Sequence, residues 1–538
     1  MIALATTASY RAIASEFFEL FKTAWEFYRD DAEYDAVICC GIEPTDIRSK
    51  LVLVYAPHEL SFDRQHGLTV LPQPAEAFVI YRERQLPIFQ GLARFEDRTH
   101  TTLVTRMTKS ASGQHWIRIG YNLLAEVQHL LTCGQPSEFA QSPSIEMHIA
   151  MLRDILVQNR VRFEEVPPIP AGYNFITCLT HDVDNFAVRN HRFDHTILGF
   201  LYRASIGSLI DFCRGRKTLA QVGRNYATVL SLPLVYLRVL PDFWSRPERY
   251  LEMEPASTFF IIPKKGDAGL SSDGAKLPRR AAQYELAQLQ TSIRRILAQG
   301  GEIAVHGIDA WRDPVAARDE QERVRSVTNS SEIGIRMHWL FFDAESPTIL
   351  EEAGYSYDST IGYNNAVGYR AGTTQAFKPL GMERLLELPL HIMDTALFYP
   401  AHLNLSPRQA RERLNALVND AKEFGGVLTI NWHDRSIAPE RLWDDFYLEF
   451  IRTLQEAGAC FCTGGEATRW FRKRRSIDFK ANGKCKYERA NDGLPGLRVR
   501  SYRGEPAPQF GVGREPVLNT PFHEILFGNC GEMVHAVS

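Results

Sequence analysis

Two aspartates follow an apolar stretch in FITCLTHDVDNF, residues 175–186. Residues 175–179 are apolar or β-branched and predict a buried strand, which runs directly into Asp182 and Asp184. Side chains two residues apart on an extended chain share a face. Two carboxylates placed in this way repel each other unless a proton, a cation or hydrogen bonds compensate. The pattern therefore indicates either an Asp-rich turn or a metal ligand beside a catalytic carboxylate.

Histidines lie at the ends of three further apolar stretches. His306 is in EIAVHG, His338 in GIRMHWL and His433 in VLTINWH. Imidazoles and a carboxylate form a ligand set that suits zinc or another first-row divalent ion. Such an ion lowers the pKa of a bound water to about 7, a second carboxylate can accept the proton, and a histidine can protonate a leaving group. The sequence thus contains the groups required for metal-assisted hydrolysis.

The elements that must position these residues alternate between apolar strands and helical patterns. Strands are predicted at 175–181, 257–263, 302–307, 334–340, 385–392, 427–433 and 459–463, and helices at 284–299, 346–354 and 406–424. Such alternation predicts an α/β fold with a parallel sheet, and this number of repeats predicts a barrel. In barrels of this type the carboxyl ends of the strands carry the chemistry. The polar residues described above fall at these ends.

Two regions flank the predicted barrel. Residues 1–165 contain apolar strands at 36–42 and 50–57 and a helical pattern at 146–161, and are predicted to form an N-terminal α/β accessory domain. The stretch VPPIPAGYN marks a boundary, because prolines and glycine interrupt regular structure. Residues 471–538 are rich in glycine, proline and short alternating runs, and are predicted to be a small β-rich C-terminal extension or a partly ordered tail.

The segment 186–250 interrupts the alternating pattern. It has ten Lys or Arg residues against four acidic ones, together with the apolar stretches TILGFLYRASIGSLIDF and VLSLPLVYLRVL. One interpretation is a basic helical insertion that caps the barrel. The other is a platform for an anionic substrate or a membrane surface. The two interpretations are compatible.

The bulk composition is ordinary for a globular protein. The 538 residues are 45% hydrophobic and 23% charged, and the net charge of −3 gives no reason to expect nucleic acid as a partner. Nine cysteines lack zinc-ribbon or redox spacing, which is typical of a reducing compartment. The N-terminus lacks the basic region of a signal peptide, and no run of 18 apolar residues predicts a spanning helix. We therefore expect a cytoplasmic protein, peripheral to the membrane if 186–250 binds one.

The ordered set THDVD, STFF, EIAVHG, YDST, GYRAGT, LELPLHIMD and INWH resembles the polysaccharide deacetylase family (NodB-homology, carbohydrate esterase 4-like) over roughly residues 173–470. The resemblance implies a distorted (β/α) barrel and assigns Asp182 as general base and Asp184 as metal ligand, although these two roles could be exchanged. It also implies His433 as general acid, Asp394 as the residue that orients His433, and Arg370 as the partner of the catalytic aspartate.

The sequence departs from the family pattern at one motif. The family's second motif has two histidines four residues apart, whereas His306 is followed at that distance by Ala310. Alanine cannot bind a metal, so the third ligand comes from elsewhere or is water, or else the metal has been lost. His338 is the candidate for a ligand from elsewhere. A substrate contact or a core histidine are the alternatives for His338. His391 is expected to be at most a neighbour of the site, and His181 to be structural.

These residues lead to one main expectation and two alternatives. The main one is a metal-dependent hydrolase that removes N-acetyl groups from a carbohydrate and uses zinc, with cobalt or nickel as alternatives. The carbohydrate is a lipid-linked glycan if 186–250 contacts a membrane. The first alternative is an O-deacetylase or a small amide or imide hydrolase on the same barrel. The second is a non-catalytic carbohydrate-binding or scaffold protein that has lost the metal. The sequence identifies neither the sugar nor the oligomeric state.

Overall fold

The structure is a computed structural model that describes residues 1–71, 77–96, 102–103, 105–109, 113–271, 273–480, 483–486, 493–503, 523–526 and 534–536. The chain divides into two compact units. Unit 1 comprises Met1–Gly172, Arg370–Gly381 and Trp470–Ser538, and unit 2 comprises Tyr173–Tyr369 and Met382–Arg469. Much of the predicted C-terminal extension lies outside the described residues, and its described part belongs to the same unit as the N-terminal region.

Unit 1 is built on a six-stranded sheet of order β10-β11-β4-β3-β1-β2. The strands are β1 (Ile2–Thr6), β2 (Trp25–Phe27), β3 (Tyr34–Cys40), β4 (Ser49–Tyr55), β10 (Thr105–Lys109) and β11 (His115–Ile119). All neighbours are parallel except β10 and β11. The longer helices of this unit are α1 (Arg11–Phe21), α3 (Leu123–Thr132) and α4 (Ser144–Gln158). In a second sheet, β12 (Phe163–Glu165) pairs with β24 (Arg498–Tyr502), which explains why both chain ends belong to one unit.

Unit 2 is built on a parallel sheet of order β18-β17-β16-β15-β14-β13-β20-β19, with β21 also paired to β13. The strands are β13 (Phe175–Val183), β14 (Thr258–Ile261), β15 (Glu302–Gly307), β16 (Gly334–Met337), β17 (Tyr357–Asp358), β18 (Leu386–Glu387), β19 (Ile392–Met393), β20 (Val427–Asn431) and β21 (Ala459–Phe461). Every residue of the central strand β13 is buried, as is usual for a parallel strand covered on both faces.

One short segment closes this sheet into a distorted barrel. β18 pairs with β17, and five residues later β19 pairs with β20, so residues 386–393 reach both edges of the sheet. The backbone N–H of His391 also donates to the carbonyl of Thr429, next to this junction. The predicted α/β barrel is therefore confirmed. The strand predicted at 385–392 is instead two short strands, because one segment cannot pair along its whole length with two edges that diverge.

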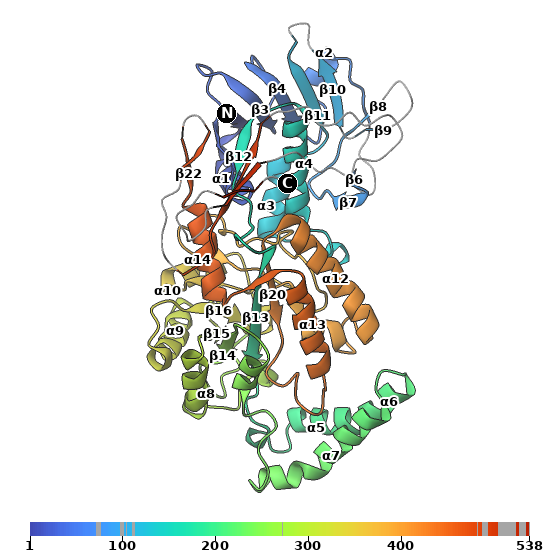
Figure 1. Cartoon of the computed structure of the whole chain (residues 1–538), viewed down its shortest axis with the longest axis vertical. Coiled ribbons are helices and arrows are strands. Elements are labelled where there is room, and N and C mark those ends of the chain that lie inside the picture. Colours follow the sequence, from blue (N-terminus) through green and yellow to red (C-terminus); the bar gives the residue numbers. More distant parts are fainter. Residues whose placement is uncertain are drawn as a thin grey trace. The chain divides into compact units, whose positions relative to one another are not determined.

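Helices surround the barrel and bury their apolar faces against it (Figure 1). They include α8 (Leu286–Ala298), α9 (Pro314–Thr328), α10 (Ser346–Ala353), α12 (Pro407–Phe424) and α13 (Asp444–Glu456). Ser406 caps α12 by accepting from the N–H of Gln409, and the left-handed Gly354 ends α10.

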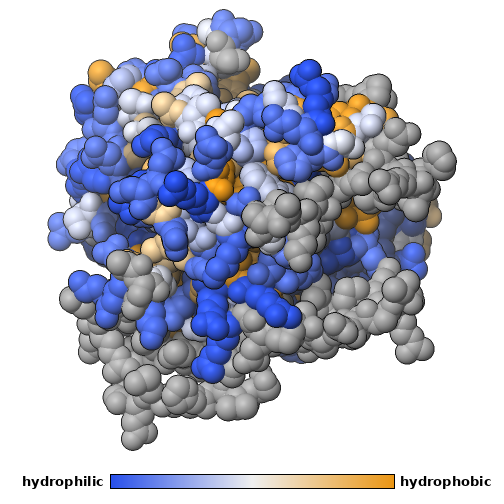
Figure 2. Space-filling model, turned by 90° about the horizontal axis from the view of Figure 1, so that it is seen from above, coloured by the Kyte–Doolittle hydropathy of each residue, from blue (hydrophilic) through white to orange (hydrophobic). Residues whose placement is uncertain are grey.

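The predicted insertion forms a separate set of helices in unit 2, namely α5 (His195–Tyr202), α6 (Ser208–Cys213) and α7 (Leu219–Tyr236), with a π-helical turn, Arg203–Gly207, between the first two. Figure 1 shows that these helices project beyond the ones that cover the barrel. Among the described residues, one helical stretch, His195–Cys213, has the length and apolar composition of a membrane-crossing helix, with 22% of it buried. On the face seen in Figure 2, by contrast, hydrophilic side chains predominate among those coloured.

Candidate metal centre and active-site pocket

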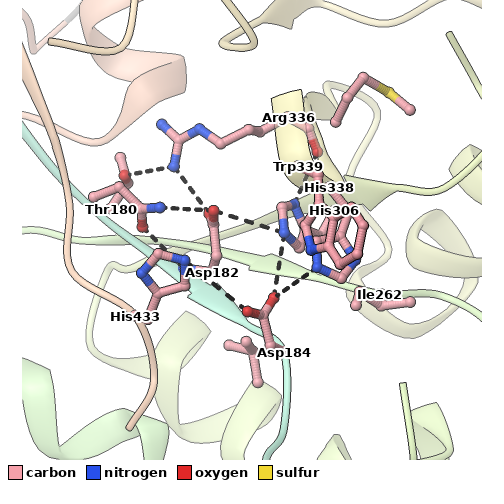
Figure 3. Close-up of polar contacts among 12 residues, drawn as sticks. Thr180, Asp182, Asp184, Ile262, His306, Arg336, His338, Trp339 and His433 are labelled. Atoms are coloured by element: carbon pink, nitrogen blue, oxygen red, sulfur yellow. Dashed lines mark hydrogen bonds and ion pairs between the residues drawn. The ribbon is translucent and has the colours of Figure 1, made fainter. Parts of the chain in front are cut away.

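Asp184, His306 and His338 come together at the carboxyl ends of β13, β15 and β16 (Figure 3). Asp184 Oδ1 lies 3.4 Å from Nε2 of His306 and 3.7 Å from Nε2 of His338. All three ligand atoms lie within 4.8 Å of one another. Ligands that surround a zinc ion tetrahedrally, at about 2.0–2.2 Å, are about 3.3–3.6 Å apart. The spacing therefore fits one divalent ion with room for further ligands.

Strand register explains why these three residues meet. β15 lies beside β16, and His306 is paired in register with Arg336, two residues before His338. His306 Nδ1 lies 2.9 Å from the carbonyl oxygen of Arg336, which leaves Nε2 free to face Asp184. β16 ends at Met337, earlier than the sequence predicts, because Trp339 and Leu340 take left-handed φ values of 65° and 56°. This strained turn directly follows His338 and ends the strand at the site.

The chemistry of this donor set fits a bound cation. Asp184 Oδ1 is buried and has no hydrogen-bond partner among the described residues, which is costly for a carboxylate oxygen unless a cation is present. Although burial favours its neutral form, the neighbouring His306 and the protonated His433 hold the pKa of Asp184 well below its usual range. Burial lowers the pKa of His338 to about 3, so its imidazole is neutral, as a metal ligand must be.

Asp182 lies beside this cluster but has different partners. Arg336 Nη1 donates to Asp182 Oδ1 at 2.9 Å, and Asn431 Nδ2 donates to Oδ2 at 2.7 Å. His306 Nε2 is 3.6 Å from Asp182 Oδ2. Burial favours the neutral carboxyl, but His306, Arg336 and His433 together hold the pKa of Asp182 below its usual range. Asp182 is therefore ionised and fixed in orientation.

The arginine that bonds Asp182 is Arg336 rather than Arg370, which corrects the sequence prediction. Arg370 belongs to unit 1, where its carbonyl oxygen accepts from the backbone N–H of Gln135. Arg336 is fully buried, and it also donates to Thr180 Oγ1 at 2.8 Å. The reason is topological, since Arg336 lies on β16, which belongs to the same sheet as β13, whereas the GYRAGT segment leaves the barrel unit at residue 370.

His433 and Asp394 form a hydrogen-bonded pair. His433 lies on the side of Asp184 away from His306 and His338 (Figure 3). Asp394 Oδ1 is 2.6 Å from His433 Nδ1, and Asp394 Oδ2 accepts from the backbone N–H of His433 at 2.8 Å. The hydroxyl of Ser436 also donates to Asp394. Burial alone lowers the pKa of His433, but the carboxylate of Asp394 outweighs it and raises this pKa to about 10. The protonated imidazole presents Nε2 4.0 Å from Asp184 Oδ2.

One cavity of about 540 Å³ in unit 2 is lined by Asp182, Asp184, His306, His338 and His433, while Arg336, Asn431 and Asp394 contact these residues from behind the wall. Its wall also contains Trp339, Phe341, Tyr399 and five arginines. A volume of this size suits one or two sugar residues, within the range of small-molecule sites. The strand ends, the acid–base groups and the cavity thus coincide.

Other residues singled out in the sequence lie elsewhere. His391 Nδ1 lies 3.2 Å from the backbone nitrogen of Thr429, and the ring packs on Tyr369, so His391 does not join the cluster. His181 is fully buried between the carbonyl of Trp432 and the carboxylate of Glu254. Ala310 is packed in the core of unit 2, where the family pattern would place a histidine.

Two residues of the site, Arg336 and Asn431, were not predicted from the sequence. Each lies two residues before a site histidine, Arg336 before His338 and Asn431 before His433. A polar residue at this spacing in an apolar strand shares the face of the site residue. That period-2 signal could have identified both.

No protein-family model and no curated protein matches the chain. Solved structures to which it is similar include a probable polysaccharide deacetylase from Pseudomonas aeruginosa, at 15% identity and TM-score 0.35, covering 57% of this chain and 94% of the other. An allantoinase is similar at 15% identity and TM-score 0.34, covering 56% and 92%. A family 4 acetyl xylan esterase from Clostridium thermocellum, in complex with a cobalt ion, is similar at 14% identity and TM-score 0.24, covering 55% and 91%. These neighbours include members of the family that the sequence motifs resemble, but scores this low carry no argument about activity, which rests on the site itself.

Proposed function

We propose that this chain is a metal-dependent hydrolase that removes N-acetyl groups from a carbohydrate. The observation that carries the proposal is the arrangement of three sets of groups around one cavity. Asp184, His306 and His338 form a cation site, and the ionised Asp182 and the protonated His433 flank it. A site that only bound sugar would not need an acid–base pair.

Asp182 acts as the general base in this proposal. Its two hydrogen bonds, from Arg336 and Asn431, fix the carboxylate and leave its remaining lone pairs directed to the cavity. A divalent ion held by Asp184, His306 and His338 would supply a Lewis acid and lower the pKa of water. Asp184 is the ligand and Asp182 the base, rather than the reverse, because Asp184 Oδ1 contacts both imidazoles.

His433 acts as the general acid. A departing amine needs a proton, and the imidazole that carries one here is held by Asp394 through Nδ1, which leaves Nε2–H directed to the cavity. The ligand set of two imidazoles and one carboxylate suits zinc, and cobalt or nickel would fit the same donors.

Paired variants test this assignment. Asp182→Asn should abolish most deacetylation of N-acetylglucosamine oligomers, by at least about a hundredfold, while it keeps the bound metal. Asp184→Ala should lose both activity and metal. Wild-type activity in Asp182→Asn would refute the mechanism. Turnover of O-acetylated xylan or of small cyclic amides in place of N-acetyl sugars would favour the alternative hydrolases on the same barrel. Metal binding without any turnover would favour a non-catalytic carbohydrate-binding protein.

We propose, as a second point, that helices α5–α7 contact a membrane surface on the cytoplasmic side and bring the barrel to a lipid-linked glycan. Large apolar side chains are exposed along these helices, among them Leu198 (60%), Ile206 (57%), Leu219 (72%) and Leu230 (77%). The segment 186–250 also has a net charge of +6, from ten basic and four acidic residues. Apolar side chains beside basic ones are typical of helices that lie on anionic lipid.

Vesicle flotation tests the membrane proposal. Wild-type protein should float with vesicles of phosphatidylglycerol and phosphatidylcholine, and high salt should weaken this binding. Leu230→Glu should reduce the floated fraction severalfold. Val315→Glu is the matched control, because Val315 has a similar exposure, 72% against 77% for Leu230, but lies on α9. Failure of wild type to float at low salt would overturn the proposal.

A further inference from the structure

Three of the five arginines in the wall of the catalytic cavity lie near the ring of Tyr399. Arg203 lies on the π-helical turn after α5, and Arg435 and Arg441 lie in the loop after β20. We call these three residues the arginine cluster. Burial raises the pKa of Tyr399, but the charges of all three arginines lower it, so the three guanidinium groups lie near that side chain. Arg441 Nη2 donates to the hydroxyl of Tyr399.

Carboxylates compensate the charges of the arginine cluster only in part: burial raises the pKa of the nearby Glu440, and the three arginines oppose this rise. Among the residues that the structure describes, none of its members forms an ion pair, and each has a buried nitrogen without a hydrogen-bond partner: Arg203 Nε, Arg435 Nη1 and Arg441 Nε. Arg441 is only 4% exposed. Burial and then the charges of Arg441 and Arg435 lower the pKa of Arg203 to about 10. Unpaired buried cations with unused donors are costly unless an anion occupies the site.

The backbone makes room for this arrangement. A Cβ atom built on Gly199 would lie 3.1 Å from Arg203 Nη1, so the guanidinium group packs against a position that has no side chain. Arg435 and Arg441 are held over the rings of Trp244 and Trp443, with the guanidinium carbons 5.4 and 5.1 Å from the ring centroids. These contacts preorganise the arginines rather than neutralise them.

The arginine cluster also borders a second cavity. Arg203, Tyr399 and Arg441 line both the catalytic cavity and a neighbouring one of about 470 Å³. The wall of the second cavity combines apolar residues, among them Phe398, Trp443 and Phe446, with charged ones, among them Arg214, Arg216 and Glu449. An anion at this position would therefore lie between the cavity that contains the metal cluster and a second cavity with both apolar and charged side chains in its wall.

We infer that Arg203, Arg435 and Arg441 bind a phosphate group of the substrate, so that the carbohydrate in the catalytic cavity is a phosphorylated N-acetyl sugar. The identification of the sugar as an N-acetyl sugar rests on the proposed deacetylase function. The phosphate site does not depend on that function. Guanidinium groups match phosphate oxygens in geometry and charge. The phosphate could belong to a soluble sugar phosphate or to a lipid phosphate whose apolar chain lies in the second cavity.

Calorimetric titration of phosphate compounds into the purified protein tests the inference without requiring turnover. The protein is used at constant ionic strength after chelator treatment, so that a bound metal cannot hold the phosphate. N-acetylglucosamine 1-phosphate should bind, and neutral N-acetylglucosamine should bind at least about tenfold more weakly. Arg203→Gln and Arg435→Gln should each weaken phosphate binding about tenfold. Arg435→Lys, which keeps the charge, should weaken it less.

Arg408→Gln is the matched control, because Arg408 is 84% exposed on α12 and carries the same charge. Circular dichroism verifies that each variant is folded. Dodecyl phosphate distinguishes a lipid phosphate from a soluble sugar phosphate. If it binds more tightly than N-acetylglucosamine 1-phosphate, the phosphate belongs to a lipid, and if it binds more weakly, the phosphate belongs to a soluble sugar. Equal phosphate binding by wild type and Arg203→Gln/Arg435→Gln would overturn the inference, as would no binding at about 10 mM. Deacetylation of neutral sugars without phosphate binding would leave the proposed function standing and reject the phosphate subsite.

Discussion

The guanidinium group of Arg336 donates to the carboxylate of Asp182 across 2.9 Å, inside the barrel and with no solvent exposure of the arginine. The bond favours the charged form of Asp182, whose pKa lies below its usual range. We expect Arg336→Met to reduce kcat/KM by at least about a hundredfold. The acidic limb of the pH profile should also move to higher pH, because Asp182 then loses a cation that keeps it ionised.

Arg370→Met provides the comparison for this variant. The sequence motif assigned the aspartate-binding role to Arg370, whereas the structure gives it to Arg336. Arg370→Met should therefore leave the acidic limb where it is. A shift of that limb in Arg370→Met but not in Arg336→Met would mean that the correction is wrong.

Asp394→Asn tests the pair that holds His433. The carboxylate of Asp394 is the main influence that raises the pKa of His433, to about 10, against the effect of burial. An acid works only below its pKa, so the wild-type enzyme should keep its activity to high pH. Asp394→Asn should move the basic limb toward neutral pH and lower turnover. An unchanged basic limb would show that another group is the acid.

Ala310→His tests whether the missing motif histidine could simply be restored. Ala310 is fully buried in the core of unit 2, so a larger side chain there must displace its neighbours. We expect a loss of stability on the order of 1–3 kcal/mol and no recovery of metal binding when the change is combined with His338→Ala. Urea denaturation and metal analysis measure the two effects. A double variant with full metal content would instead show that position 310 can still reach the ion.

Glu146 gives a pH dependence of stability in unit 1. It is buried, accepts hydrogen bonds from Thr373 and Thr374, and has its pKa raised by burial from 4.5 to about 7. Between these two values the folded state keeps the proton and the unfolded state releases it. The free energy of unfolding therefore falls as pH rises from about 4.5 to 7, by on the order of 3 kcal/mol for this group.

Glu146→Gln should make that pH dependence shallower, as measured by urea denaturation at pH 5 and pH 8. Glu412→Gln, at an exposed position on α12, should leave it unchanged. Some dependence should remain in Glu146→Gln, because burial also raises the pKa values of Glu126 and Glu320 to about 7. A steeper dependence in Glu146→Gln would contradict the assignment.

The barrel was predictable because its strands are short apolar runs whose ends are marked by polar residues. The same feature located Asp184, His306 and His338, which lie at the carboxyl ends of three strands and meet only through strand register. Arg336 was missed because motif order pointed to Arg370, although the spacing of Arg336 from His338 was available. The turn at Trp339 and Leu340 could not be predicted, since left-handed φ values at these residue types arise from tertiary context.

The closure of the barrel could not be predicted from the sequence either. Residues 385–392 were predicted to form one strand, but residues 386–387 pair with β17 and residues 392–393 pair with β20, and the positions of both sheet edges determine this pairing. The arginine cluster escaped notice for a related reason, because Arg203 and Arg441 are far apart in the chain and become neighbours only after α5–α7 fold against the barrel.

Metal content in wild type and His338→Ala tests the central claim most directly. Protein purified without added metal or chelator would be analysed by plasma mass spectrometry, with His402→Ala as the control, since His402 lines the cavity outside the metal cluster. We predict about one zinc, cobalt or nickel ion per chain in wild type and in His402→Ala, and a loss of most of it in His338→Ala. Equal metal content in all three, or none in wild type after metal is added back, would contradict the account.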